Sequence, residues 1–177
     1  MTPDARAAIV RALPKALPGK LVAPEKWHFT LRFLGPTSRE ARDTIINRLS
    51  SANLGSVFQI RFGELGAFPN PRRARVLWLG LTRGGQRLSD LAAIAEDAAR
   101  NAGFAAESRL FTPHLTLSRV DPPQNIAALL AQNHSYAIEM TVTALILYRS
   151  RLGGGPSQYE EAARFDLSNA GPSGGRR

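Results

Sequence analysis

The order of apolar and polar residues along the chain predicts alternating strands and helices. Apolar residues recur at helical spacing in three stretches, which predict helices at 3–13, 38–51 and 86–103. Short apolar runs between turn-forming residues predict strands at 27–34, 56–63, 74–81 and 114–120. The alternating run 135–142 and the apolar run 144–150 follow, and 159–167 closes the folded part. This order of elements favours an α+β domain.

Local signals place several helix ends. Pro3 suits the first turn of the first helix, and Gly103 suits the end of the third. Thr37 and Glu40 have the spacing of a capping box, which places the second helix start after Thr37. The two prolines after Asp121 predict a further helix that starts at about 122.

Two of the predicted strands carry nearly the same sequence. "HFTLRF" begins at His28 and "HLTLSR" begins at His114, about half the chain later, and each is followed by a proline-containing turn and a predicted helix. This internal repeat predicts two related lobes, each a small antiparallel sheet with helices on one side.

Each repeated motif divides its residues between two faces. Residues i and i+2 of a strand point the same way, so His28 and Thr30 share one face while Phe29 points to the other. The same alternation places His114 and Thr116 together. If the two sheets face each other across a cleft, two imidazoles and two hydroxyls converge there.

Two imidazoles and two hydroxyls suit in-line displacement at phosphorus. One base must act on the attacking oxygen and one acid on the leaving oxygen, and a histidine, with an ordinary pKa of about 6.5, can serve as either near neutral pH. Threonine hydroxyls can donate hydrogen bonds to the non-bridging phosphate oxygens. A lone motif of this kind is more often structural, but the chain has only three histidines and two of them occupy matching contexts.

Composition narrows the alternatives. The chain has 177 residues, 44% of them apolar, which fits one domain or two small lobes with a real core. Without cysteines it has no thiol chemistry, and with three histidines it has few metal ligands, so we expect neither a metal nor a cofactor. The N-terminus lacks the apolar stretch of a signal peptide and no run is long enough to span a bilayer, which predicts a cytoplasmic protein without a membrane partner.

The charge balance favours a polyanionic partner. Lysine and arginine number 23 against 14 acidic residues, giving a net charge of +9 and an isoelectric point near 11.1. A soluble protein that is merely basic remains the alternative. Charge alone does not separate RNA from DNA.

The paired motifs resemble those of the two-histidine H-x-T-x phosphoesterases, and specifically the RNA 2′,3′-cyclic phosphodiesterases also called 2′-5′ RNA ligases. The segments "PEKWHFTLRFLG", "GAFPNPRRARVLWLGL", "FTPHLTLSR" and "LYRSRLGGGPSQYEEAARFDL" are similar to segments that occur in the same order in that family. The resemblance implies a bilobal fold with two pseudo-symmetric antiparallel sheets, helices on the outside and a central cleft that carries both motifs.

The resemblance also implies a reaction. An RNA terminal 2′,3′-cyclic phosphate would be hydrolysed to a 2′-phosphate, with His28 as the proton donor to the leaving 3′ oxygen and His114 as the base that activates water. The two roles exchange in the ligase direction. Thr30 and Thr116 would bind the phosphate.

Other residues are candidates for substrate binding. Arg119 follows its motif at a position where similar proteins often carry arginine, although alternation puts it opposite His114 unless the strand bulges. Arg32 shares the face of His28 by the same alternation. For both arginines, the alternative to substrate binding is a solvent-exposed side chain at the end of a strand. Four more residues in the resembling segments are expected to line the cleft: Phe68, Arg75, Arg149 and Tyr159. For Phe68, stacking on a base and a place in the core are both open.

The resemblance has one departure, because members of the family usually begin with an R-x-F-x-A strand that this chain lacks. We expect such a strand to be encoded upstream of Met1; otherwise a sheet edge is exposed. We expect a monomer, with residues 1–167 forming the bilobal domain and 168–177 a disordered tail. Two other functions stay open: a non-catalytic module that binds RNA ends, and a phosphodiesterase for small cyclic nucleotides.

Overall fold

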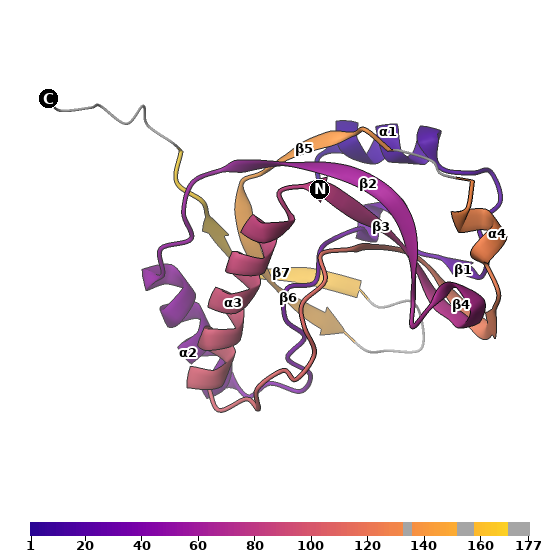
Figure 1. The fold of residues 1–177 in the computed structure, drawn as a ribbon. Helices are drawn as coiled ribbons and strands as arrows, with labels where there is room; N and C mark the ends of the chain where they lie inside the picture. Colours follow the sequence, from indigo (N-terminus) through magenta and orange to yellow (C-terminus); the bar gives the residue numbers. More distant parts are fainter. Residues whose placement is uncertain (133–135, 152–157, 170–177) are drawn as a thin grey trace, which may run out of the picture. The chain divides into compact units, whose positions relative to one another are not determined.

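The computed structural model describes residues 1–132, 136–151 and 158–169 (Figure 1). Its helices are α1 (Pro3–Ala12), α2 (Arg39–Ser51), α3 (Gly85–Asn101) and α4 (Ala127–Leu130), with 3-10 turns η1 (Pro24–Lys26) and η2 (Pro71–Arg73). Its strands are β1 (Lys20–Leu21), β2 (Phe58–Phe68), β3 (Ala74–Arg83), β4 (Leu115–Gln124), β5 (Glu139–Val142), β6 (Ala144–Arg151) and β7 (Gln158–Asp166).

The chain divides into two compact units, each built from three separate segments. The first unit comprises Met1–Thr30, Gln59–Gln86 and Thr112–Met140, and the second comprises Leu31–Phe58, Arg87–Phe111 and Thr141–Arg177. All four residues of the two predicted motifs, His28, Thr30, His114 and Thr116, belong to the first unit. The repeat therefore does not correspond to one motif per unit, because the chain enters each unit three times instead of completing one before the other.

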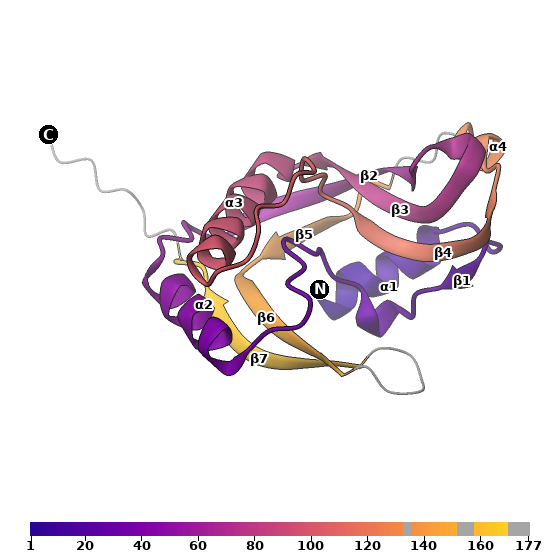
Figure 2. The same cartoon turned by 90° about the horizontal axis from the view of Figure 1, so that it is seen from below.

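A five-stranded sheet, in the order β1-β4-β3-β2-β5, forms most of the first unit (Figures 1 and 2). Its central strands are antiparallel, and α1 lies beside the sheet in both views. One face carries the fully buried Leu77, Leu79, Leu115 and Leu117, and we call it the leucine face. The other carries Trp78 and is called the Trp78 face.

A β-bulge in β4 decides which side chains reach the Trp78 face. Thr116 pairs with Trp78 and Ser118 pairs with Leu77, so Leu117 is an extra residue with no partner of its own on β3. Beyond it Arg119 pairs with Val76. Val76 and Trp78 share a face of the regular strand β3, and paired residues share a face, so Thr116 and Arg119 both lie on the Trp78 face.

Strand β1 reaches the edge of β4 because residue 19 is glycine. Gly19 has φ +78, and a Cβ atom there would overlap the backbone carbonyl of Arg119 and lie 2.9 Å from the Cα of Val120. This close approach pairs Lys20 with Arg119 and Leu21 with Ser118, and the backbone N–H of Val22 then donates to the carbonyl of Leu117. The bulge and β1 therefore support each other.

The second unit combines the antiparallel hairpin β6–β7 with α2 and α3. Ile45 and Leu49 of α2 are buried, as are Leu91 of α3 and Phe165 of β7. The Oγ atom of Ser38 caps α2 by accepting from the N–H of Ala41. The cap is thus one residue later than the predicted Thr37, whose hydroxyl donates to the carbonyl of Gly35 instead.

The strand predicted at 27–34 is not formed. Lys20–Leu21 occupies the edge of β4, and η1 then turns the chain, so that 27–30 runs extended without joining either sheet. Trp27 is buried and Thr30 is exposed, as alternation along an extended segment would place them, while His28 and Phe29 between them are both partly buried.

The helix predicted to start at about 122 is also wrong. Pro122 and Pro123 belong to β4, where four residues of β4 oppose one of β3 between the pairs Arg119–Val76 and Gln124–Ala74. Proline is tolerated in such an irregular stretch because no ladder hydrogen bond is required of it. The helix follows later, as α4.

Ser168, which the sequence analysis assigned to the tail, contacts other residues of the second unit. Ser168 forms a parallel bridge with Ser56, donates its N–H to the carbonyl of Gly55 and accepts from the N–H of Val57. Residues 170–177 of the predicted tail lie outside the described residues. Among the helices that the structure describes, none combines the length and the apolar character needed to cross a membrane.

The close approach at Gly19 predicts that Gly19→Ala destabilises the protein more than Gly103→Ala does. Gly19→Ala adds both left-handed backbone strain and overlap with β4, so we expect it to lower the free energy of unfolding by about 2–4 kcal/mol. Gly103 has φ +90 with nothing within 4 Å of the position of a Cβ atom, so Gly103→Ala measures the strain alone. Urea denaturation of both variants checks the difference, and equal costs would contradict the close packing of β1 on β4.

The buried hydroxyl of Ser118 gives a second prediction. Ser118 is fully buried on β4, and within the described ranges its Oγ atom has no hydrogen-bond partner. Ser118→Ala removes this desolvated polar group, so we expect the free energy of unfolding to stay unchanged or to rise by about 1–2 kcal/mol. Ser38→Ala, which removes a helix cap, is the opposite control and should cost about 1 kcal/mol. A loss of stability in Ser118→Ala would show that the hydroxyl has a partner in solution.

Candidate active site

The first motif lies on an extended segment fixed by its apolar neighbours. Trp27 is buried and its indole Nε1–H donates to the carbonyl of Val22 at 3.0 Å. The ring of Phe29 stacks on the core residue Phe62 with 6.0 Å between centroids. Because Trp27 and Phe29 are held inward, alternation directs His28 and Thr30 to the other side of the segment.

The two histidines are anchored in the same way. The Nδ1 atom of His28 lies 2.7 Å from the carbonyl oxygen of Lys26, and the Nδ1 atom of His114 lies 2.7 Å from that of Thr112. In each case the carbonyl belongs to the residue two positions earlier. A carbonyl only accepts, so Nδ1 carries a proton in both rings and Nε2 is the atom that can gain or lose one.

Two aromatic rings fix the orientation of His114. The ring of Phe68 meets the imidazole at an interplanar angle of 85° with 4.9 Å between centroids, and the ring of Trp78 lies 6.2 Å away at 57°. Phe68 and Trp78 also contact each other, at 5.1 Å. Gly66 lies on β2, and a Cβ atom at this position would overlap the indole ring of Trp78 on β3. The glycine therefore leaves the space that the indole ring occupies.

Thr116 and Arg119 lie on the Trp78 face, which also carries these rings. Alternation along a regular strand would place Arg119 opposite His114, but the bulge at Leu117 reverses that order. Arg119 is exposed and Thr116 is partly buried. The strand thus brings a hydroxyl and a guanidinium to the face on which the imidazole of His114 is packed.

Arg32 is occupied by contacts within the second unit. Its Nε atom forms an ion pair of 2.6 Å with Glu96, and its terminal nitrogens donate to the carbonyls of Phe33 and Ala105. The guanidinium of Arg32 therefore connects α3, through Glu96, to the loop that contains Ala105.

Glu107 lies in the same loop. Hydrogen bonds donated by the Arg109 side chain, and then by its backbone, lower the pKa of Glu107 from 4.5 to about 2.

The remaining predicted residues fall in different places. Phe68 contacts His114, as described above, whereas Arg75 is exposed near the start of β3, where the pairing with β4 is irregular. Arg149 and Tyr159 belong to the hairpin of the second unit, where the ring of Tyr159 lies 6.1 Å from that of Tyr148.

Sequence analysis missed two residues of the Trp78 face. Trp78 could have been found, because it alternates with Val76 in a strand whose intervening residues are leucines. Lys20 could not, because its strand has only two residues and no pattern of its own. It lies directly opposite Arg119.

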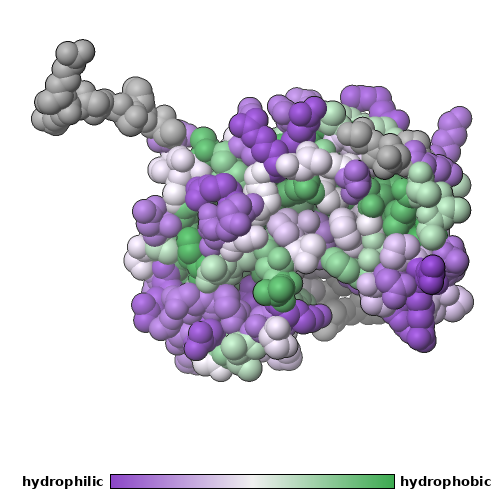
Figure 3. Space-filling view, in the orientation of Figure 1, coloured by the Kyte–Doolittle hydropathy of each residue, from purple (hydrophilic) through white to green (hydrophobic). Residues whose placement is uncertain are grey.

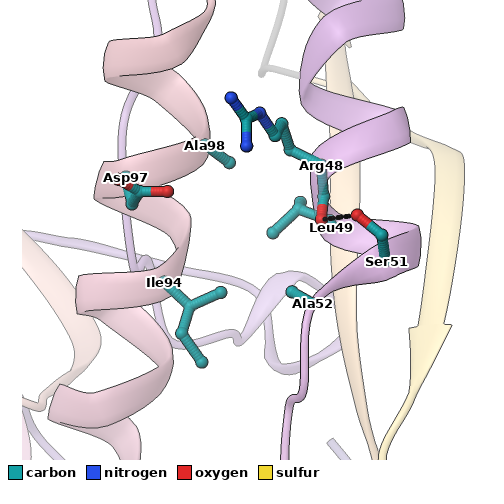
Figure 4. A pocket seen from close by; sticks show the side chains of 7 residues that line it. All are labelled: Arg48, Leu49, Ser51, Ala52, Ile94, Asp97 and Ala98. Atoms are coloured by element: carbon teal, nitrogen blue, oxygen red, sulfur yellow. Dashed lines mark hydrogen bonds between the residues drawn. The ribbon is translucent and has the colours of Figure 1, made fainter.

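A small cavity lies apart from these residues, between α2 and α3 of the second unit (Figure 4). Its volume is about 220 Å³, and it is lined by Arg48, Leu49, Ser51, Ala52, Ile94, Asp97 and Ala98. Within the described residues, no three His, Cys, Asp or Glu side chains are grouped so that they could hold a metal ion.

Each of the two anchored imidazoles can transfer a proton. Each ring presents Nε2 for exchange of a proton, and each is followed two residues later by a threonine hydroxyl that can donate to an anion. These are the groups that acid–base catalysis at a phosphate ester requires.

Comparison with known proteins identifies the family. The profile of the 2′-5′ RNA ligase superfamily matches residues 2–154. An RNA 2′,3′-cyclic phosphodiesterase of Methanothermobacter thermautotrophicus is 34% identical over 153 residues, 84% of this chain and 82% of that protein. A protein of the same name from Aeropyrum pernix is 38% identical over 114 residues, which are 64% of each chain.

The solved structures agree with the fold. LigT of Escherichia coli, crystallised with NADP⁺, superposes with a TM-score of 0.75 at 25% identity, over 96% of this chain and 94% of that one. This likeness confirms the predicted α+β class with antiparallel sheets. By its sequence, over most of its length, the chain belongs to the 2′-5′ RNA ligase superfamily.

Proposed function

We propose that this protein hydrolyses the 2′,3′-cyclic phosphate at the end of an RNA strand to a 2′-phosphate, by acid–base catalysis at His28 and His114. The observation that carries the proposal is the matching anchorage of the two imidazoles, each with Nδ1 held 2.7 Å from the carbonyl two residues earlier. The relatives of this chain that are named RNA 2′,3′-cyclic phosphodiesterases support the substrate. A cytoplasmic monomer is part of the proposal.

The proposed reaction is an in-line displacement by water. The Nε2 atom of His114 takes a proton from water as its oxygen bonds to phosphorus, the bond from phosphorus to O3′ breaks, and the Nε2 atom of His28 gives its proton to O3′. The hydroxyls of Thr30 and Thr116 donate to the non-bridging oxygens, where negative charge is greatest. Every proton has a donor and an acceptor among these residues, so the scheme runs without a metal.

Ligation would use the same groups. For a 2′,3′-cyclic end and a second RNA end with a free hydroxyl, the hydroxyl replaces water as the attacking group, the bond from phosphorus to O3′ breaks and a 2′-5′ linkage forms. His114 and His28 keep their roles as base and acid in this step, and the roles exchange when the 2′-5′ linkage is cleaved back to the cyclic phosphate. Relative rates of hydrolysis and ligation then depend on how each attacking group binds.

Removing either imidazole should abolish most of the activity. We expect His28→Ala and His114→Ala each to lower kcat by about 10²- to 10⁴-fold, because each removes one proton transfer of the reaction. The measurement is conversion of a short RNA with a 2′,3′-cyclic end to a 2′-phosphate, in the presence of EDTA. Circular dichroism and binding of a 3′-phosphate-ended RNA by the same variants serve as controls for folding.

Three results would contradict the proposal. A folded wild-type protein that binds RNA ends without converting them would favour a binding module. Conversion of cyclic mononucleotides but not of RNA would favour a small-molecule phosphodiesterase. Loss of wild-type activity in EDTA, restored by a divalent cation, would contradict metal-independent catalysis.

The pH dependence should assign the two roles. With the acid and the base both required, kcat should follow a bell-shaped curve, rising as the base loses its proton and falling as the acid loses its own. In the direction of hydrolysis, residual activity of His28→Ala should lack the alkaline fall and that of His114→Ala should lack the acid rise. A wild-type curve that is flat from pH 5 to 8 with chemistry rate-limiting would argue against two-histidine catalysis.

A further inference from the structure

We infer that Lys20 and Arg119 together bind a backbone phosphate of the RNA strand, the one that precedes the cyclic end. This inference rests on the proposed function and extends the site from the terminal phosphate to its neighbour. It begins from the pairing of two cations on adjacent strands.

Lys20 and Arg119 are direct cross-strand partners. They oppose each other in the β1–β4 register and both are exposed. Residues paired in this way have neighbouring Cβ atoms on the same face of the sheet, where like charges repel. Within the parts of the chain that the structure describes, no carboxylate forms an ion pair with either of them.

A specific backbone geometry holds this unfavourable pair in place. Gly19 allows β1 to touch β4 at the carbonyl of Arg119, and the N–H of Val22 fixes the strand at 2.8 Å from the carbonyl of Leu117. The bulge at Leu117 then sets Arg119 on the Trp78 face, and its partner Lys20 is placed there with it. An anion bound between the two side chains would remove the repulsion.

Position along the sheet indicates which anion. Thr116 pairs with Trp78 and Arg119 pairs with Val76, so their rows are two residues of β3 apart, roughly 6.6 Å. Successive phosphates of an extended nucleic-acid strand have a comparable separation. If Thr116 binds the terminal phosphate, Lys20 and Arg119 lie where the preceding phosphate would pass.

The location of the pair matters more than its charge. Arg61 and Arg83 also oppose each other, between β2 and β3, so like-charged pairs recur on this basic chain. The face that Figure 3 shows carries both hydrophilic (purple) and apolar (green) patches. The pair Lys20–Arg119 differs from that pair of arginines because Arg119 lies on the same strand as Thr116, whereas Arg61 and Arg83 lie on β2 and β3.

The test compares two substrates that differ in this phosphate. A trinucleotide with a 2′,3′-cyclic end has a backbone phosphate for the pair to bind, whereas a 2′,3′-cyclic mononucleotide has none. We expect Lys20→Met to raise KM for the trinucleotide by about 5- to 10-fold and to leave the mononucleotide unchanged. The slope of log(kcat/KM) against log salt should become shallower by about 0.7 for the trinucleotide.

Two further variants separate the contact from general charge effects. Lys20→Arg keeps the cation and should restore most of the KM. Lys15→Met removes the same charge from an exposed lysine of the first unit outside the sheet, and should leave KM for both substrates unchanged.

The outcomes distinguish this inference from the proposed function. An equal rise in KM for both substrates would move Lys20 to the terminal phosphate, and no change with either would overturn the inference, while wild-type turnover still supports the phosphodiesterase. If the wild type converts neither substrate, the proposed function fails. The role of Lys20 is then tested by measuring the affinities of wild type and Lys20→Met for a trinucleotide and for a mononucleotide, both with 3′-phosphate ends. Equal affinities of wild type and Lys20→Met for that trinucleotide would overturn the inference in this case as well.

Discussion

The extra residue at Leu117 is the constraint on which the organisation of the first unit depends. In a regular strand every second residue faces the core, so Thr116 and Arg119 would point in opposite directions. The bulge lets Leu115, Leu117 and Val120 all remain buried while Thr116 and Arg119 share the opposite face. Pairing with β1, made possible by Gly19, covers the irregular stretch and keeps its backbone groups bonded. Core packing and the candidate site are therefore two consequences of one irregularity.

Anchorage of the imidazoles is the second feature that local backbone geometry controls. A hydrogen bond from Nδ1 to a carbonyl two residues earlier spans only three residues of the chain, and it forms after the 3-10 turn η1 for His28 and directly after Pro113 for His114. The bond selects the tautomer that leaves Nε2 for chemistry. For His114, Phe68 and Trp78 add a packed wall that limits rotation of the ring. The same ring is therefore held by a polar contact at one nitrogen and by apolar contacts at its sides.

The positive charges that contribute to the net charge of +9 differ in whether they are paired with acidic groups. Most arginines of a basic protein are solvated, and Arg32 shows that a cation in a resembling motif can be committed to structure, through Glu96 and two carbonyls. Lys20 and Arg119 differ because no acidic side chain in the described ranges balances them and their strands hold them together. Charge that is fixed in position, and left unbalanced, is what a polyanion requires of a binding surface.

The sequence by itself determined the three longer helices α1, α2 and α3, most of the strands and the identity of both motifs, because these depend on the period of apolar residues and on residue types that are rare in this chain. It also predicted that His28 and Thr30 share a side, since alternation needs only an extended backbone. The tertiary structure alone decided that 27–34 has no strand partner, that Pro122 continues a strand, and that Arg119 joins the face of Thr116. Each of these depends on which segment occupies the edge of β4 and where its register slips, and pairing between distant segments leaves no periodic signal in either one. Lys20 is the clearest case, because a two-residue strand has meaning only through its partner.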